Sequence, residues 1–140
     1  MKKVLIINGP NMNMLGKRPK EHYGTLTLEE LNERIREENH GFFELDFFQS
    51  NCEGALITKL QECIHYYGIL INPASYTHSS IGIRDALDMC TGTKLEIHLS
   101  KVDEREDFRK VNYIRDVCDK TFSGKKEESY LEALRFLKKL

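Results

Sequence analysis

The chain has 140 residues, of which 40% are hydrophobic and 31% are charged, and its formal net charge at pH 7 is −1. This length suits one domain over residues 1–140, and the composition speaks against a disordered chain. The nearly balanced charge gives no reason to expect nucleic acid as a partner. No apolar run of about 18 residues occurs, so we predict no membrane span.

The N-terminal apolar stretch is too short for a signal peptide and ends at Asn8 and Gly9. We therefore interpret it as a strand and expect a cytoplasmic protein. No Cys-x-x-Cys pair occurs among Cys52, Cys63, Cys90 and Cys118, and free thiols are favoured over disulfides. The histidines are not at ligand spacing to one another or to paired carboxylates, so we predict no metal site.

Apolar runs and helical periodicities alternate along the chain, which is typical of βαβ units around a mostly parallel sheet. One helix begins with a capping box, in which Thr27 precedes Glu30 by three residues. In chain order we expect a strand at 3–8, a long loop at 9–26, a helix at 28–39, a strand at 42–49, a helix at about 53–67, a strand at 69–72, a loop at 73–79, a helix at about 80–90, a strand at 94–99, a charged segment at 102–110, a weak strand near 121–122 and a helix at about 127–139.

This alternation predicts a flavodoxin-like α/β fold, a three-layer sandwich with a five-stranded parallel sheet of order 2-1-3-4-5. In such sheets, ligands bind beyond the carboxyl ends of the strands. Polar residues gather after those ends in this sequence, and the loop at 9–26 is about three times the usual length. A mobile lid would explain that length, and an idle surface loop is the alternative.

Tyr23 lies on this loop, five residues after Arg18. A free phenol ionises near pH 10, and a guanidinium close to it favours the phenolate. A phenolate is a strong base that can take a proton from a carbon next to a carbonyl. We interpret the tyrosines in predicted helices as packing residues and leave two others open: the first group is Tyr66, Tyr67 and Tyr130, and the second is Tyr76 and Tyr113.

His98 alternates with inward apolar residues on the fourth strand, so it could be a core histidine. Glu96 favours a catalytic reading, because side chains two residues apart on a strand share a face. The carboxylate would fix the tautomer and leave the other ring nitrogen as a general acid. The remaining histidines have no such neighbour in the sequence, and we expect them to be exposed: His22, His40 and His65.

Other polar residues near the strand ends suit the binding of an anionic ligand. Asn11 and Asn72 could donate amide hydrogens to an enolate oxygen or a carboxylate. Arg109 offers a fork for a carboxylate. Surface ion pairs are the alternative for Arg109 and for Arg105, with Glu104, Glu106 or Asp107 as partners. We interpret Asp85 as part of a solvent-exposed helix face.

Several strings resemble motifs of the type II 3-dehydroquinate dehydratases. They are INGPNMNMLGKR…YG at 7–24, SNCEG at 50–54, INPASYTHSSIGIRDAL at 71–87 and LEIHLS…RE.FR at 95–109, in the family's order and spacing. The resemblance implies a lyase without cofactor or metal that converts 3-dehydroquinate to 3-dehydroshikimate and water. That reaction belongs to the shikimate pathway of aromatic amino acid biosynthesis or to the quinate pathway.

The same resemblance assigns roles to individual residues. Tyr23 would take the C2 proton, with Arg18 keeping it ionised, and Asn11 with a water would hold the enolate. His98, oriented by Glu96, would protonate the departing C1 hydroxyl. The substrate's hydroxyls and carboxylate would be held by Asn72, His78, Leu99, Ser100 and Arg109. Asp85 would reach a neighbouring subunit's site, which implies a trimer and commonly a homododecamer of four trimers.

The alternative to an enzyme is a binding or signalling module of the same fold. A phosphoacceptor receiver would have paired acids after the first strand, and an FMN domain would have a phosphate loop rich in serine and threonine. Asn-Gly-Pro-Asn stands there instead, at 8–11. A relative that has lost turnover is a further alternative, and it would lack Tyr23, Arg18 or His98, all of which are present. The chain departs from the family's usual residues at 19–20, 74–75, 101 and 123–129.

Overall fold

The computed structural model describes residues 1–140, apart from the side chain of Asp103. Five parallel strands form one sheet in the order β2-β1-β3-β4-β5. The strands are β1 (Lys3–Asn8), β2 (Glu44–Gln49), β3 (Gly68–Asn72), β4 (Thr93–His98) and β5 (Lys120–Ser123). The strand order and the parallel sheet predicted from the sequence are confirmed.

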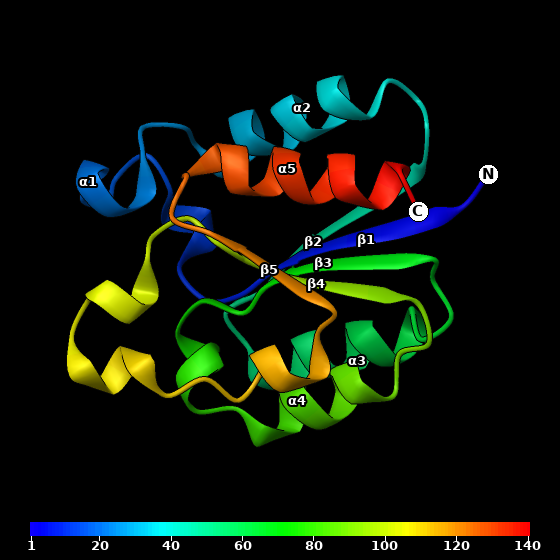
Figure 1. Ribbon diagram of the computed structural model, residues 1–140. Coiled ribbons are helices and arrows are strands. Elements are labelled where there is room, and N and C mark those ends of the chain that lie inside the picture. The colour runs from blue at the N-terminus through cyan, green and yellow to red at the C-terminus, as the bar shows by residue number, and fades with distance from the viewer.

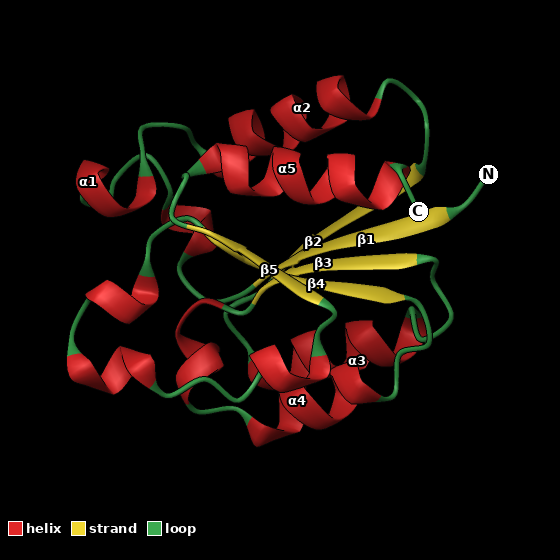
Figure 2. Cartoon of the chain, viewed as in Figure 1, coloured by secondary structure: helices red, strands yellow, loops and turns green.

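Helices cover both faces of the sheet and complete a three-layer sandwich (Figure 1). α2 (Leu28–Asn39) and α5 (Glu127–Lys138) lie side by side on one face, and α3 (Glu53–Glu62) and α4 (Ile81–Asp88) lie on the other. The short helix α1 (Lys20–Tyr23) stands apart from both layers, on the side of the carboxyl ends of the strands. Figure 2 shows that further short helical turns gather on that same side of the sheet.

The central strands are buried on both faces, as the continuous apolar run of the first strand predicts. Val4 and Ile6 of β1 pack into the core under α2 and α5, whereas Leu5 and Ile7 pack into the core under α3 and α4. All four side chains are at most 1% exposed. Burying an aliphatic side chain contributes about 1.5–3 kcal/mol, so these two cores hold the sheet that carries the strand ends in place.

Most elements lie within one or two residues of the predicted bounds, and two of the differences have a visible structural reason. α3 ends at Glu62 rather than near residue 67, because the N–H of Tyr66 bonds the carbonyl of Cys63 at 3.0 Å and closes a turn where a longer helix would continue. β2 begins at Glu44 rather than at residue 42. The backbone groups of Phe43 bond the side chain of Asn39 and not a neighbouring strand. The N–H of Phe43 donates to Oδ1 of Asn39 at 3.0 Å, and its carbonyl accepts from Nδ2 of Asn39 at 2.9 Å.

The first connection has more structure than the sequence predicts. It contains a 3-10 turn at Met12–Met14 and the helix α1, and Tyr23 is the last residue of that helix. Met12 and Leu15 are buried in the core under α2 and α5. These two side chains anchor the first half of the connection to the domain. Whether it moves as a lid stays a prediction.

No helix in the described residues is both long enough and apolar enough to cross a membrane. The structure records all four cysteines as free thiols, of which Cys63 and Cys90 lie in the core and Cys52 is exposed.

Candidate active site

A cavity of about 110 Å³ lies beyond the carboxyl ends of β1, β3 and β4. Its walls come from the first connection, from the turn after β3 and from the segment that follows β4. Of the predicted site residues, all except Glu96 and Asp85 line it: Asn11, Arg18, Tyr23, Asn72, His78, His98, Leu99, Ser100 and Arg109. The structure therefore brings together groups that lie almost a hundred residues apart in the sequence.

Glu96 and His98 form a buried pair on β4, where they share one face of the strand. The ring nitrogen Nε2 of His98 lies 2.6 Å from Oε2 of Glu96, and the side chains are 3% and 0% exposed. Because a carboxylate only accepts, Nε2 carries the hydrogen of this bond. Nδ1 is then the ring nitrogen left for a ligand in the cavity that His98 lines. The pairing expected from the spacing is present in the structure.

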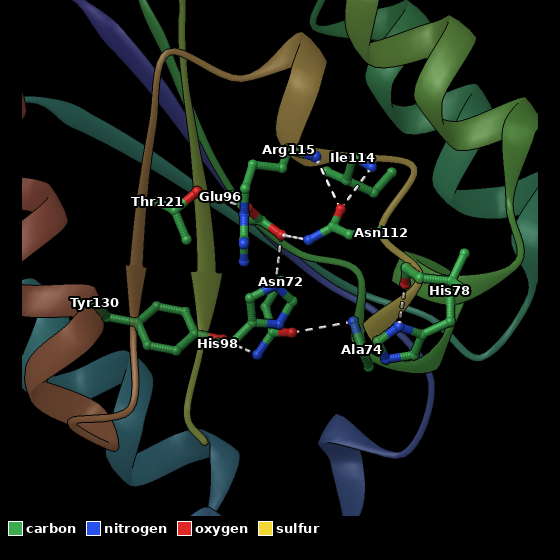
Figure 3. Close-up of polar contacts among 11 residues, drawn as sticks. Asn72, Ala74, His78, Glu96, His98, Asn112, Ile114, Arg115, Thr121 and Tyr130 are labelled. Atoms are coloured by element: carbon green, nitrogen blue, oxygen red, sulfur yellow. Dashed lines mark hydrogen bonds and ion pairs between the residues drawn. The ribbon is translucent and has the colours of Figure 1, made fainter. Parts of the chain in front are cut away.

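The Glu96 carboxylate accepts three further hydrogen bonds (Figure 3). Asn112 donates to Oε2 at 2.7 Å, and Thr121 and Arg115 donate to Oε1 at 2.7 and 3.1 Å. Burial alone raises the pKa of Glu96, but the bonds from His98, Thr121 and Asn112 outweigh it and lower the pKa to about 2. The carboxylate is therefore ionised at neutral pH. Sequence reasoning missed these three partners, because no motif marks the segment that carries them.

Two guanidinium groups contact the phenol of Tyr23. Arg18 stacks on the ring, with Cζ 3.6 Å from the ring centroid. Arg105 donates from a terminal nitrogen to the Tyr23 hydroxyl at 2.7 Å. Sequence reasoning placed Arg18 beside this phenol correctly, but the partner of the hydroxyl itself is Arg105, for which a surface ion pair was the alternative. Both contacts bring a guanidinium group against the phenol.

The ion pairs weighed for Arg105 and Arg109 are also present. Glu106 bonds Nε of Arg109 at 2.7 Å and lies 3.9 Å from Nε of Arg105. The two arginine side chains are only 23% and 12% exposed, and both line the cavity. The bond from Arg109 lowers the pKa of Glu106. Glu106 therefore holds the Arg109 guanidinium at the cavity and lies close to that of Arg105, so the two interpretations are compatible.

Asn72 is less available to a ligand than the sequence suggested. Its Nδ2 donates to the Tyr130 hydroxyl at 3.0 Å, and its Oδ1 accepts from the backbone N–H of Ala74 at 3.0 Å. Tyr130 is fully buried in the core, as expected of a packing residue, but its hydroxyl also serves this amide. A helical periodicity identifies the buried side of α5 and says nothing of such a polar contact.

His78 lines the cavity from the turn after β3. Its Nδ1 donates to the carbonyl of Val111 at 2.6 Å, which leaves Nε2 as an acceptor when the ring is neutral. Burial lowers the pKa of His78, and the nearby charges of His98 and Arg109 act in the same direction, against the hydrogen bond to Val111. The ring is therefore neutral at pH 7.

Of two further residues predicted to bind a ligand, Asn11 lies at the cavity and Asp85 lies outside it. Asn11 lines the cavity with its backbone in the left-handed region (φ 68°), held by a bond from its N–H to the side chain of Asn51 at 2.9 Å. Asp85 is exposed on α4 and does not line the cavity of its own chain. His40 and His65 are exposed as expected, but the expectation was wrong for His22, which is half-buried edge-on against the Tyr23 ring.

Among the described side chains, no group of three or more histidines, cysteines or carboxylates is placed to hold a metal ion. The fold and the cavity define a flavodoxin-like α/β protein with a polar cavity at the carboxyl ends of its strands.

Comparisons with known proteins name its family. The model described as Dehydroquinase class II matches residues 2–138. A 3-dehydroquinate dehydratase of Thermotoga petrophila is 42% identical over 138 residues, which cover 98% of this chain and 95% of that protein. The type II dehydroquinase structure from Butyrivibrio crossotus has a TM-score of 0.93 at 42% identity and covers 97% of each chain. The structure from Propionibacterium acnes has a TM-score of 0.95 at 29% identity and covers 100% of this chain and 98% of that one. The chain belongs to the class II dehydroquinase family.

Proposed function

We propose that this protein is a 3-dehydroquinate dehydratase, a lyase that removes water from 3-dehydroquinate and forms 3-dehydroshikimate. One observation carries the proposal beyond family membership. The same cavity is lined by a phenol that contacts two guanidinium groups and, separately, by an imidazole that is bonded to a buried carboxylate. Elimination next to a ketone needs such a pair, because one group must take a proton from carbon while another gives a proton to the leaving hydroxyl.

Tyr23 is the proposed base. As a phenolate it takes the C2 proton of the substrate, and the electron pair left at C2 moves toward the ketone to form an enolate. The guanidinium groups of Arg18 and Arg105 stabilise the phenolate that starts this step. Asn11, through a water, holds the enolate oxygen. A donor at a developing oxyanion typically lowers the barrier by about 3–4 kcal/mol.

His98 is the proposed acid. Its Nε2–H stays hydrogen-bonded to Glu96. Its Nδ1–H gives a proton to the C1 hydroxyl, which leaves as water while the C1–C2 double bond forms. The ionised Glu96 stabilises the imidazolium that precedes this transfer. Proton transfer from Tyr23 back to His98, by way of solvent, restores both groups. The reaction exchanges only protons and water, so it has no need of a redox cofactor.

The remaining polar groups of the cavity bind the substrate. Arg109 pairs with the carboxylate, since a guanidinium matches a carboxylate in two parallel hydrogen bonds. His78, Asn72 and the backbone at Leu99 and Ser100 hold the hydroxyls. In the cell this reaction serves the shikimate pathway, and we place it in the cytoplasm.

Asp85 acts in a neighbouring subunit in this proposal. It is exposed on α4, and Ile81 and Met89, which lie four residues before and four residues after it, are 57% and 54% exposed. Residues at this spacing share a helix face. We propose that this face meets a second copy, forming trimers that assemble to a dodecamer. Light scattering of the purified protein tests this, and a monomer at micromolar concentration contradicts it.

The reaction itself is tested by ultraviolet absorbance. The product has a carbon–carbon double bond conjugated with its ketone, which the substrate lacks, so turnover raises the absorbance. We expect a rise in absorbance proportional to protein concentration when 3-dehydroquinate is added. Purified, folded protein that gives no rise with this substrate contradicts the proposed function.

A further inference from the structure

Tyr130 carries a hydroxyl in the middle of a core where phenylalanine would fill the same space. The residue is 0% exposed, and its hydroxyl donates to Oδ1 of Asn8 at 2.5 Å and accepts from Nδ2 of Asn72 at 3.0 Å. Burial raises the pKa of Tyr130 despite the hydrogen bond from Asn72. The hydroxyl therefore keeps its proton and remains a donor. A buried polar group that is fully paired specifies one arrangement of its partners.

The two amides that it joins end neighbouring strands. Asn8 is the last residue of β1 and Asn72 the last residue of β3, and they lie opposite each other in the parallel register. The backbone closes the same junction, where the N–H of Gly9 bonds the carbonyl of Asn72 at 2.8 Å. A hydroxyl has one hydrogen to donate, and Asn8 receives it. The Asn72 amide must therefore turn its NH2 group, and not its oxygen, toward Tyr130.

This orientation of the amide reaches the cavity through Ala74. The Oδ1 atom of Asn72 points to the backbone N–H of Ala74, which donates to it at 3.0 Å (Figure 3). Ala74 has φ 55°, in the left-handed region that is unfavourable for a residue with a side chain. Such a backbone persists only where its surroundings hold it. Ala74 begins the turn Ala74–His78, and Ala74, Ser75 and His78 all line the cavity.

We propose that Tyr130 is a positioning residue of this active site, whose hydroxyl sets the orientation of the Asn72 amide and through it the turn that carries His78 to the substrate. The inference rests on the proposed function, because the turn matters only if the cavity binds the substrate. Tyr130 lies on α5 and is not among the cavity-lining residues, so it acts through Asn72 and touches no reacting atom.

The test replaces the hydroxyl alone. Tyr130→Phe keeps the ring in the core and removes one of the contacts that orient the Asn72 amide, while the bonds of this amide to Ala74 and Met12 remain. We expect KM for 3-dehydroquinate to rise about tenfold while kcat changes less than threefold. Tyr66→Phe is the matched control. It removes a hydroxyl that bonds Asp46 at 3.1 Å, away from the cavity, and its KM should equal that of the parent. A simple loss of folded protein lowers kcat and leaves KM unchanged, which overturns the proposal.

A double-variant cycle shows whether the effect runs through Asn72. KM of Tyr130→Phe combined with Asn72→Ala should equal KM of Asn72→Ala alone, and independent multiplication of the two effects overturns the proposal. If Tyr130→Phe does not fold, Asn8→Ala removes the acceptor that directs the same hydroxyl, and the same rise in KM is expected. An inactive parent overturns the proposed function together with this inference. An active parent and a Tyr130→Phe variant with unchanged KM overturn this inference alone.

Discussion

Replacement of Glu96 by glutamine tests the buried carboxylate with almost no change of shape. The carboxylate accepts bonds from His98, Asn112, Thr121 and Arg115, and it is 0% exposed. A glutamine amide has one oxygen and one NH2 group, so its NH2 group must face donors on one side. At least one buried donor then loses its acceptor, which typically costs about 1–3 kcal/mol.

The magnitude follows from the pKa of Glu96, which is lowered from 4.5 to about 2. This difference corresponds to roughly 3 kcal/mol by which the surroundings favour the ionised form in the folded protein. Because the folded pKa lies below the unfolded one, this stabilisation is complete above about pH 4.5 and is lost as the pH falls toward 2. We therefore expect the free energy of unfolding of Glu96→Gln at pH 7 to be roughly 3 kcal/mol below that of the parent. The difference between the two free energies should become smaller below pH 4.5.

The same substitution should also lower kcat of the variant that remains folded. Without the negative charge, the His98 imidazolium loses its partner and its fixed orientation, and we expect kcat to drop about 100-fold with KM little changed. Denaturant unfolding at several pH values and initial rates on the folded variant measure both effects. Glu38→Gln is the matched control, because it makes the same change in a surface ion pair with Arg135, where less than about 1 kcal/mol is expected. Parent-like kcat and stability in Glu96→Gln would refute the assigned role of the carboxylate.

Three further predictions concern other parts of the molecule. Arg105→Met removes the donor on the Tyr23 hydroxyl and should lower kcat about 10–100-fold in steady-state assays, whereas a kcat within twofold of the parent contradicts the contact's role. Thr27→Ala deletes the side-chain acceptor of the α2 capping box and should cost about 1 kcal/mol in thermal unfolding without changing turnover, and an unshifted midpoint would show that the cap contributes nothing. A chelator should leave the rate unchanged, and inhibition that a divalent metal reverses would contradict a reaction carried by side chains alone.

The strand order and several local features could be predicted because they depend on neighbours in the sequence. The capping box is present in both directions, with Glu30 N–H to Thr27 at 3.2 Å and Thr27 N–H to Glu30 at 2.9 Å. The pairing of Glu96 with His98 follows from the two-residue period of a strand. The end of α3 was missed because apolar residues continue its helical spacing beyond Glu62, into a turn.

The rest of the site depends on contacts between distant segments. Arg105 lies 82 residues from Tyr23, and only the docking of the segment after β4 brings its guanidinium to the phenol. Asn112 and Thr121 reach Glu96 in the same way, from a stretch whose sequence has no periodic pattern. Periodicity predicts that Tyr130 is buried, but the direction of its hydroxyl is set by two strand ends that lie far away in the chain.

The assignment of Tyr23 as the carbon base is tested most directly by the Tyr23→Phe variant. This variant keeps the ring stacked against Arg18 at the cavity and removes only the oxygen that accepts the proton. Turnover of 3-dehydroquinate is followed by absorbance, and binding of the same compound to the folded variant is followed by calorimetry. The account predicts nearly abolished turnover with measurable binding. Activity within tenfold of the parent would contradict it.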